Sequence, residues 1–266
     1  MYDRFKRRID YLRVSVTDRC NLRCRYCMPA EGVALEQHED MLSFEQITAI
    51  VRTATELGVT KVRLTGGEPL VRSGIVTLVE QLAAVQGIEK LAMTTNGILL
   101  PRYAKELRNA GLTAVNISLD TLDAGRYAEL TRGGKVHAAV AGVDAAVAAG
   151  FRTIKINTVV GPDTSQEELL ALAAFCAERG ILLQRIRQYT LTTSKLDDTT
   201  YDRPPSCSEC NRIRLTANGK LKPCLHSDTE IPVDFADIAG SLERAVAAKP
   251  FHGAACTNRS MMQIGG

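Results

Sequence analysis

The chain has 266 residues, 45% hydrophobic and 24% charged, so it can bury a full core as one large α/β domain or as a domain with a small appendage. Its net charge of +3 is too small to indicate nucleic-acid binding, although it allows a local basic site for an acidic small molecule. Because the N-terminus lacks an apolar stretch and no apolar run approaches the roughly 20 residues that span a bilayer, we expect neither a signal peptide nor a membrane protein.

Short β-rich runs alternate with helical stretches along most of the chain. The runs are 11–16, 61–65, 90–94, 113–119, 153–159 and 182–186. This alternation predicts parallel strands joined by right-handed crossovers. Six units fall short of the eight in a closed barrel, so we predict an open, partial (β/α)₆ barrel of the TIM type. The predicted domains are this barrel over 1–188 and a small C-terminal region over 189–266.

The helical stretches carry recognisable start and stop signals. Ser43 and Gln46 form a capping-box pattern before an apolar stripe with a 3.6-residue period, and Gly58 is placed to end that helix. The stretch at about 165–179 repeats the pattern. These signals support the helices that the barrel requires.

Polar and glycine residues gather where the predicted strands end, at 65–69, 94–97, 116–120 and 155–158. An ordinary strand-to-helix turn explains any one of these motifs, because it needs the same residue types. Four of them at the same ends of parallel strands instead predict a ligand site at the C-terminal rim of the barrel.

Three cysteines, Cys20, Cys24 and Cys27, directly follow the first predicted strand. Three thiolates can hold a [4Fe–4S] cluster and leave one iron open to a ligand that is not protein. The alternative is a structural zinc site completed by Asp18 or His38, but structural zinc spacings pair Cys-x₂-Cys with a distant second pair. With no export signal, metal ligation is favoured over disulfides for the eight cysteines, and we expect a cytoplasmic protein.

The segment 20–27, with Gly-Gly-Glu-Pro at 66–69, resembles the radical S-adenosylmethionine (SAM) enzymes. The resemblance implies that SAM binds the open iron and that the reduced cluster cleaves it to methionine and a 5′-deoxyadenosyl radical. The positions that it implies for SAM contact are Tyr26, Gly67, Glu68, Ser118, Asn157 and Thr190.

A second triplet is formed by Cys207, Cys210 and Cys224. Spacing alone leaves open both a zinc ribbon, with His226 as fourth ligand, and an iron–sulfur site. The segment 211–224 is similar to the GTP 3′,8-cyclase family, which opens molybdenum-cofactor biosynthesis, and the similarity runs from about residue 3 to the terminal Gly-Gly. It implies a second [4Fe–4S] cluster, whose open iron binds the guanine of GTP.

The same resemblance implies a lyase that forms (8S)-3′,8-cyclo-7,8-dihydroguanosine 5′-triphosphate after the radical abstracts H3′ of GTP. The implied GTP contacts are Arg13, Arg63, Thr94, Lys155, Arg185, Arg212 and Arg214. Gly265 and Gly266 are implied to support the radical step. The implied partners are a low-potential electron donor, the downstream cyclic pyranopterin monophosphate synthase and a second copy of the chain in a homodimer.

Some features depart from the family. Only 17 residues separate Tyr189 from Cys207, where many cyclases have several dozen more, and Gln188 replaces the usual glutamate. The competing interpretations are another radical SAM enzyme with an auxiliary cluster, such as a peptide-modifying one, and a zinc-ribbon binding protein. Of the remaining cysteines, Cys176 is expected to be a buried hydrophobe and Cys256 has no assigned role.

Overall fold

The computed structural model describes residues 1–198, 200–203 and 205–265 and contains one mixed sheet flanked by helices. Its strands are β1 (Tyr11–Ser15), β2 (Lys61–Thr65), β3 (Lys90–Thr95), β4 (Ala114–Ser118), β5 (Thr153–Val160), β6 (Leu182–Arg187), β7 (Arg212–Leu215), β8 (Lys220–Lys222) and β9 (Ile231–Pro232). Its α-helices are α1 (Phe44–Glu56), α2 (Ile75–Ala83), α3 (Leu100–Asn109), α4 (Ala124–Thr131), α5 (Val136–Ala148), α6 (Gln166–Glu178), α7 (Ile238–Ala247) and α8 (Met261–Ile264). Three short 3₁₀ helices are η1 (His38–Asp40), η2 (Pro69–Val71) and η3 (Cys207–Glu209).

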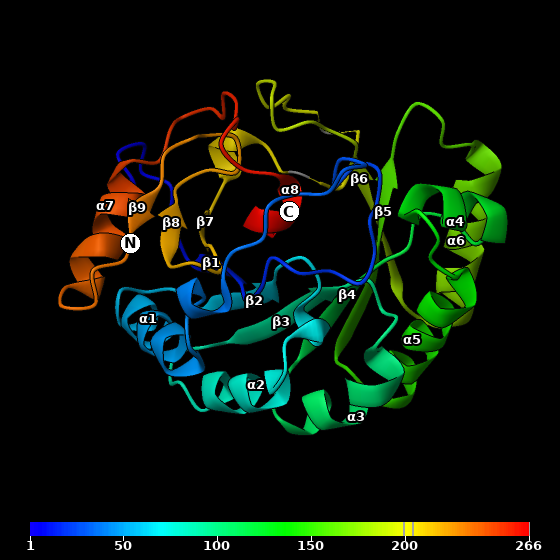
Figure 1. Ribbon diagram of the computed structural model, residues 1–266, viewed down its shortest axis with the longest axis horizontal. Helices are drawn as coiled ribbons and strands as arrows, with labels where there is room; N and C mark the ends of the chain where they lie inside the picture. The colour runs from blue at the N-terminus through cyan, green and yellow to red at the C-terminus, as the bar shows by residue number, and fades with distance from the viewer. Residues whose placement is uncertain (199, 204, 266) are drawn as a thin grey trace.

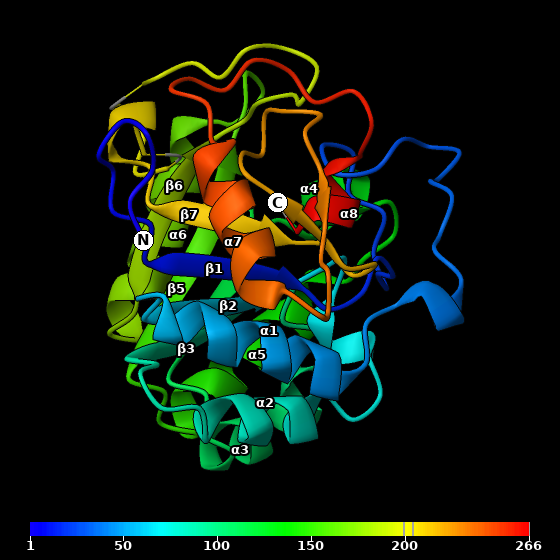
Figure 2. The same ribbon diagram turned by 90° about the vertical axis from the view of Figure 1, so that its left-hand side faces the viewer.

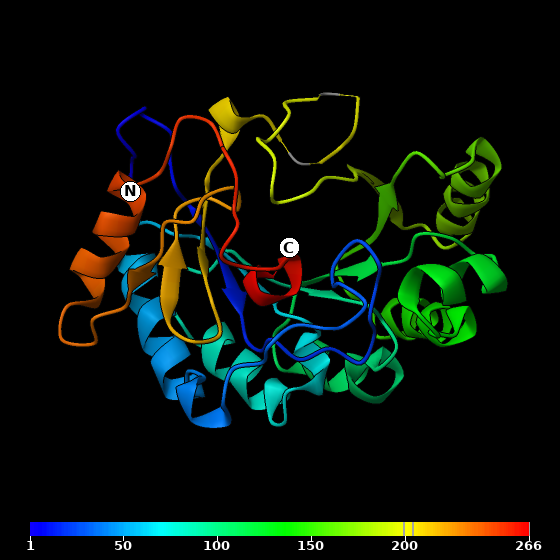
Figure 3. The ribbon, with the colours of Figure 1, turned by 45° about the horizontal axis from the view of Figure 1, so that its top comes forward.

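The six predicted strands are all present, and their ends agree with the prediction to within one residue. β1 to β6 are parallel and lie in the spatial order β6-β5-β4-β3-β2-β1. Helices α1 to α6 form an arc outside this curved sheet, and α8 lies on its concave side (Figures 1 and 3). The predicted open, partial (β/α)₆ barrel is confirmed.

Local capping explains where the helices begin. The Ser43 hydroxyl accepts a hydrogen bond from the Gln46 amide at 3.2 Å, and the Gln46 side chain accepts one from the Ser43 amide at 2.8 Å. Gly58 follows the helix with a φ of 94°, which only glycine adopts without strain. The buried stripe of α1 packs into one continuous apolar core that also contains residues of β1 to β5.

The C-terminal strands continue the same sheet instead of forming a separate one. β7 pairs in parallel with β1, beside which it lies in Figure 2, and β8 and β9 add antiparallel pairs beyond it, beside α7 (Figure 1). The sheet therefore crosses the predicted boundary at residue 188, and the division into two domains stays a prediction. Within the described part of the chain, no helix is both long and apolar enough to cross a membrane.

The pairing of β7 with β1 aligns three arginines. Arg13 is in register with Arg63 on β2 and with Arg214 on β7. Residues in register on neighbouring parallel strands lie roughly 4.8 Å apart and point to the same face. These three residues, called the arginine row below, are all buried.

Candidate active site

The first cysteine triplet lies in the loop after β1 and lines a cavity at the carboxyl ends of the barrel strands, called the first cavity here. Within this loop the Cys27 amide donates to the Cys24 carbonyl at 3.0 Å, and the Leu22 amide lies 3.4 Å from the Cys20 sulfur. Three thiols from one short loop therefore face one hollow. The strand ends that complete the hollow are those predicted from the polar rim motifs.

Gly66 and Gly67 bring the loop after β2 against the segment that precedes Cys20. The Gly67 amide donates to the Thr17 carbonyl at 2.8 Å, and the Glu68 amide donates to the Arg19 carbonyl at 2.8 Å. A Cβ atom on Gly67 would lie 2.4 Å from the Arg19 carbonyl oxygen. No side chain fits at that distance, so glycine is required here by the close approach of two backbones.

Glu68 is buried and links the ends of β2 and β3. Its carboxylate accepts hydrogen bonds from the Thr95 hydroxyl at 2.7 Å, the Asn96 amide at 2.7 Å and the Leu70 amide at 3.0 Å. Burial raises the pKa of Glu68 to about 7, although these hydrogen bonds act in the opposite direction. The carboxylate thus ties the loop after β2 to the end of β3 beside the first cavity, which it does not itself line, and its predicted contact with SAM stays a prediction.

The second triplet lines a neighbouring hollow, called the second cavity here. Cys207 is held from two sides, because Arg7 donates to its carbonyl at 2.6 Å and Asp197 accepts from its amide at 3.0 Å. Arg7 is itself oriented by a buried ion pair with Asp3 at 2.7 Å. Segments from the N-terminus and from the connector after β6 therefore meet at this cysteine.

Lys249, which follows α7, lies in the same place and is only 1% exposed. Its ammonium donates to the Arg212 carbonyl at 2.8 Å and to the Pro223 carbonyl at 2.9 Å, and lies 3.3 Å from the Cys210 sulfur. Burial alone would raise the pKa of Cys210, but Lys249 and Arg212 lower it to about 7. Among the described residues no ion pair joins Lys249 to a carboxylate, so its buried charge is suited to an anionic group at the triplet.

The spacing of the thiols bears on the zinc alternatives. Ligand atoms around a single zinc ion lie roughly 4 Å apart. In the described chain, one group of three metal-binding side chains has its ligand atoms all within 4.8 Å, namely Asp197, Cys207 and His252. Neither triplet forms so compact a group, with or without Asp18, His38 or His226. In this structure the two triplets are therefore not arranged as preformed single-ion sites.

Nine lysine and arginine side chains line the second cavity, and its described lining includes no aspartate or glutamate. They are Arg13, Arg63, Lys90, Lys155, Lys195, Arg203, Arg212, Arg214 and Lys249. Burial, with repulsion from its arginine neighbours, lowers the pKa of Arg13 to about 9. So concentrated a positive charge is suited to a ligand that carries several negative charges.

Arg212 has donors ready for such a ligand. Its Nε and Nη2 atoms are buried and have no hydrogen-bond partner among the described residues. Beside it lies Tyr11, whose hydroxyl accepts from Arg63 at 2.7 Å. Burial would raise the pKa of Tyr11, but the surrounding arginines, Arg63 foremost, lower it to about 7. An anion bound here would satisfy the buried donors and weaken the repulsion.

The two cavities adjoin, because Thr94, Asn157, Ile186 and Tyr189 line both. Gly265 lies at this boundary: it lines the first cavity, while its carbonyl accepts hydrogen bonds from Arg13 at 2.9 Å and Arg214 at 2.8 Å. A ligand in one cavity can therefore contact a ligand in the other. The predicted site residue Gly266 lies outside the described residues.

Most of the predicted site residues line one of the two cavities. In the first are Cys20, Cys24, Tyr26, Cys27, Gly67, Ser118, Asn157 and Gly265; in the second are Arg13, Arg63, Thr94, Lys155, Cys207, Cys210, Arg212, Arg214 and Cys224. Thr190 is exposed and hydrogen-bonds Thr193, and Arg185 pairs with Asp202 at 3.5 Å. Glu68, Thr190 and Arg185 line neither cavity, so their roles stay predictions.

Several lining residues were not predicted, among them Tyr11, Lys90, Lys195, Arg203 and Lys249. Tyr11 precedes Arg13 by two positions on β1, so the alternation of a strand already places both on one face. Lys249 gives no such signal, since a lysine just after a helix usually remains solvated. Only the packing of α7 against β8 and β9 directs it inward.

Comparisons of the sequence with protein families and with curated proteins point to the same family. A model of the radical SAM superfamily matches residues 14–176. The chain is 39% identical to the GTP 3′,8-cyclase of Moorella thermoacetica and 37% identical to that of Alkaliphilus oremlandii, in each case over the whole of both chains. The first alignment has 323 positions against the 266 residues of this chain, so this chain lacks residues that its relative has.

Solved structures agree on the fold. SuiB of Streptococcus suis bound to S-adenosylmethionine superposes with a TM-score of 0.66 at 18% identity, covering 87% of this chain and 64% of that longer one. The protein anSMEcpe with bound AdoMet gives a TM-score of 0.64 at 14% identity, covering 89% of this chain and 76% of the other. At these identities the likeness concerns the fold alone.

Proposed function

The chain belongs to the radical SAM superfamily and, within it, to the GTP 3′,8-cyclase family, and from this we propose that it converts GTP to (8S)-3′,8-cyclo-7,8-dihydroguanosine 5′-triphosphate. The observation that supports this most directly is the junction of the two cavities. One is bordered by the three thiols of the first triplet, and the other is bordered by cations suited to a triphosphate.

When bound, SAM and the first [4Fe–4S] cluster supply a 5′-deoxyadenosyl radical, and Cys20, Cys24 and Cys27 would hold that cluster. The protein's own contribution is orientation. The Tyr26 hydroxyl donates to Asp120 at 2.8 Å, which fixes its ring at the edge of the first cavity. We propose that Tyr26 borders the adenine of SAM and that Ser118, Asn157 and Gly67 also contact SAM.

We propose that the arginine row, together with Lys155 and Arg212, holds the triphosphate of GTP. The row supplies guanidinium groups side by side, and Arg212 supplies two buried nitrogen donors that have no acceptor among the described residues. Bound in this way, the ribose would lie toward Thr94 and Asn157, at the boundary with the first cavity. Positioning of this kind is how a protein directs a reactive radical to one hydrogen.

We also propose a second [4Fe–4S] cluster held by Cys207, Cys210 and Cys224, with an open iron for guanine. The buried Lys249 ammonium beside Cys210 supports an anionic group there. The chain contains eight cysteines, and none forms a disulfide. That state supports the reducing cytoplasm that we propose as its location.

The decisive experiment is anaerobic incubation of the reconstituted protein with GTP, SAM and a low-potential reductant. We expect 5′-deoxyadenosine to form in a GTP-dependent manner together with the cyclised nucleotide, and metal analysis to give about eight irons per chain. About four irons with one zinc would instead indicate a zinc ribbon at the second triplet. Formation of 5′-deoxyadenosine with a peptide substrate but not with GTP would favour the peptide-modifying alternative.

Arg214→Ala is expected to raise the KM for GTP by roughly 10- to 100-fold, since a charge-assisted hydrogen bond in a buried site contributes about 1.5–3 kcal/mol. Both clusters should keep their iron, because the described hydrogen bond of Arg214 goes to the Gly265 carbonyl and not to a cysteine sulfur. The measurement is steady-state kinetics with iron counts. Arg152→Ala, at an exposed arginine just before β5, is the control; loss of iron from the Arg214 variant would contradict a substrate role.

Lys249→Met is expected to speed the release of iron from the second cluster to a chelator by roughly 10- to 100-fold, the usual effect of removing a residue that supports metal ligands. The potential of that cluster should become more negative, because a cation near it is lost. Chelation kinetics and electron paramagnetic resonance titration measure the two effects. Lys61→Met, at a lysine whose side chain is 41% exposed, is the control. Unchanged iron release and potential in Lys249→Met would show that Lys249 does not support the cluster.

Partners follow from family membership alone. We propose that a low-potential electron donor reduces the first cluster, that the downstream cyclic pyranopterin monophosphate synthase takes up the product, and that the chain forms a homodimer. Size-exclusion chromatography with light scattering tests the dimer directly.

A further inference from the structure

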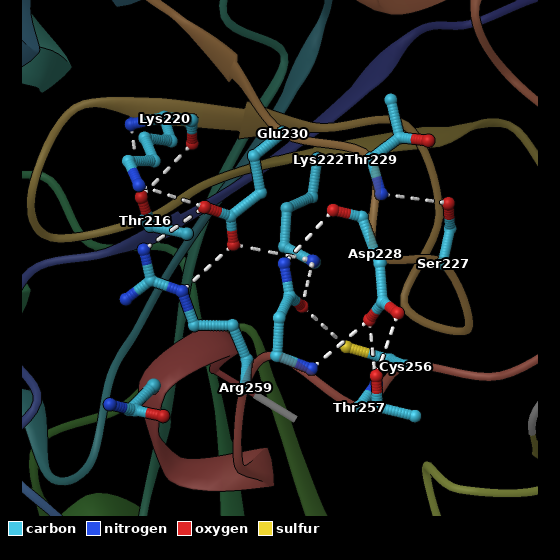
Figure 4. A network of polar contacts seen from close by, with 12 residues as sticks. Thr216, Lys220, Lys222, Ser227, Asp228, Thr229, Glu230, Cys256, Thr257 and Arg259 are labelled. Carbon is cyan, nitrogen blue, oxygen red and sulfur yellow. Dashed lines mark hydrogen bonds and ion pairs between the residues drawn. The ribbon is translucent and has the colours of Figure 1, made fainter.

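One arginine, whose side chain is largely shielded from solvent, anchors the segment that carries Gly265 to the cavity boundary. Arg259 is 9% exposed at its side chain and pairs with Glu230 through two hydrogen bonds, at 2.8 Å from Nε and 3.1 Å from Nη2 (Figure 4). Its Nη1 atom donates to Glu36 at 2.9 Å. A single guanidinium therefore joins two carboxylates from different parts of the fold.

The two carboxylates come from segments that border the two cysteine triplets. Glu230 immediately precedes β9, in the connection that leaves Cys224. Glu36 lies in the loop between Cys27 and η1, and its amide donates to Asp18 at 2.6 Å. Arg259 thus connects the C-terminal segment with the surroundings of both triplets.

A second set of contacts holds the residues just before Arg259. Asp228 accepts hydrogen bonds from the amide and hydroxyl of Thr257, at 2.6 and 2.8 Å, and from the Asn258 amide at 3.1 Å (Figure 4). Lys222, which is fully buried, lies 3.4 Å from both Glu230 and the Asn258 side chain. Cys256 is 1% exposed beneath these contacts.

Little chain separates this anchor from the site. Ser260 begins α8 through a capping box with Gln263, and the single turn ends at Gly265. The Gly265 carbonyl then meets Arg13 and Arg214 of the arginine row. Because α8 is one short turn, a displacement of Arg259 carries over to Gly265.

An ion pair that is largely shielded from water is weak support for stability, since the cost of removing the charges from water can exceed their attraction. The best-attested role of such a pair is to fix one arrangement among several. Burial alone would raise the pKa of Glu230, but hydrogen bonds from Arg259 and Lys220 hold it at about 2. The pair therefore stays charged at neutral pH.

We propose that Arg259 is a positioning residue which, through Glu230 and Glu36, fixes the C-terminal segment so that the Gly265 carbonyl contacts Arg13 and Arg214 at the junction of the two cavities. The consequence for turnover rests on the proposed cyclase function; the consequence for the placement of the segment does not. The two consequences can therefore be measured separately.

The test compares Arg259→Met with the unchanged holoenzyme under anaerobic conditions. We expect kcat for GTP to fall by roughly 10- to 100-fold, as for a misplaced catalytic segment, while the KM for GTP changes by less than about threefold. N-ethylmaleimide should label Cys256 at least roughly tenfold faster, because the segment that covers it opens locally. Labelling at Cys176, buried on α6, should not change, which distinguishes local opening from unfolding.

Two further variants complete the design. Arg259→Lys keeps a cation near Glu230 and is expected to recover part of kcat and most of the protection of Cys256. Arg244→Met removes an arginine from an exposed pair with Asp237 on α7 and should leave kcat and both labelling rates unchanged. Protection of Cys256 at the original level in Arg259→Met, or a kcat within twofold, would overturn the proposal. If the unchanged enzyme has no GTP-dependent activity, the proposed function fails, while Cys256 labelling still decides the placement of the segment.

Discussion

Cys24→Ala is expected to lower the formation of 5′-deoxyadenosine from SAM by roughly 10⁴-fold or more. The reason is that the variant loses the first [4Fe–4S] cluster, which supplies most of the rate enhancement. Cys24 is one of three thiols that border the first cavity, so two thiolates would remain for four irons. Iron counts, the absorbance of the cluster and product analysis by mass spectrometry measure the effect.

The matched variant at the second triplet, Cys210→Ala, should differ in kind. About four irons should remain, and SAM should still be cleaved slowly, but without dependence on GTP and without a cyclised nucleotide. Cys176→Ala, a buried cysteine of α6 that lines neither cavity, is the control and should retain both clusters. Equal loss of SAM cleavage in Cys24→Ala and Cys210→Ala would argue against separate roles for the two triplets.

Gly67→Ala is expected to have the next largest effect. The new Cβ would lie 2.4 Å from the Arg19 carbonyl oxygen and 3.1 Å from the Cβ of Cys20, so the two loops must separate. We expect the free energy of unfolding to fall by about 1–3 kcal/mol, the usual cost of overpacking, and SAM cleavage to fall by roughly 100-fold as Cys20 is displaced. Denaturant unfolding and 5′-deoxyadenosine formation measure these two losses.

Gly125→Ala provides the control for that substitution. Gly125 lies in α4, where an added Cβ would meet nothing nearer than an Asp123 oxygen at 3.4 Å. Alanine is favoured over glycine in a helix by about 1 kcal/mol, so this variant should be as stable as the parent or more so. If Gly67→Ala were equally well tolerated, the tight contact between the two loops would not be needed.

The barrel could be predicted because its signals are local. The capping box at Ser43, the apolar stripe of α1 and the β-rich run at 11–16 each involve a few neighbouring residues, and the structure agrees with all three. The polar strand ends were also informative, since parallel strands bring their carboxyl ends to one rim. The first cavity follows from that geometry.

The second cavity could be predicted only in part, because it depends on pairings between distant segments. The resemblance pointed to Arg13 and Arg214, but nothing local indicated that β7 would lie beside β1 and align them. Lys249 is turned inward only by the packing of α7. Arg185 was also taken from the resemblance, but it lines neither cavity and pairs with Asp202 at 3.5 Å. The sequence of β6 does not indicate this ion pair, because Asp202 lies beyond the strand.

The parallel pairing of β7 with β1 also sets the order in which the protein can be completed. The two strands are far apart along the chain, as the hydrogen bond between Asp10 and Asn211, 201 positions apart, illustrates. During synthesis, β1 to β6 leave the ribosome first, with one edge of β1 still unpaired. Contacts of such long range form late, because their loop-closure cost is large. The nascent chain should therefore bind a triphosphate only after β7 has paired with that edge. A ribosome-bound chain that ends before β7 would be a partial barrel without a nucleotide site.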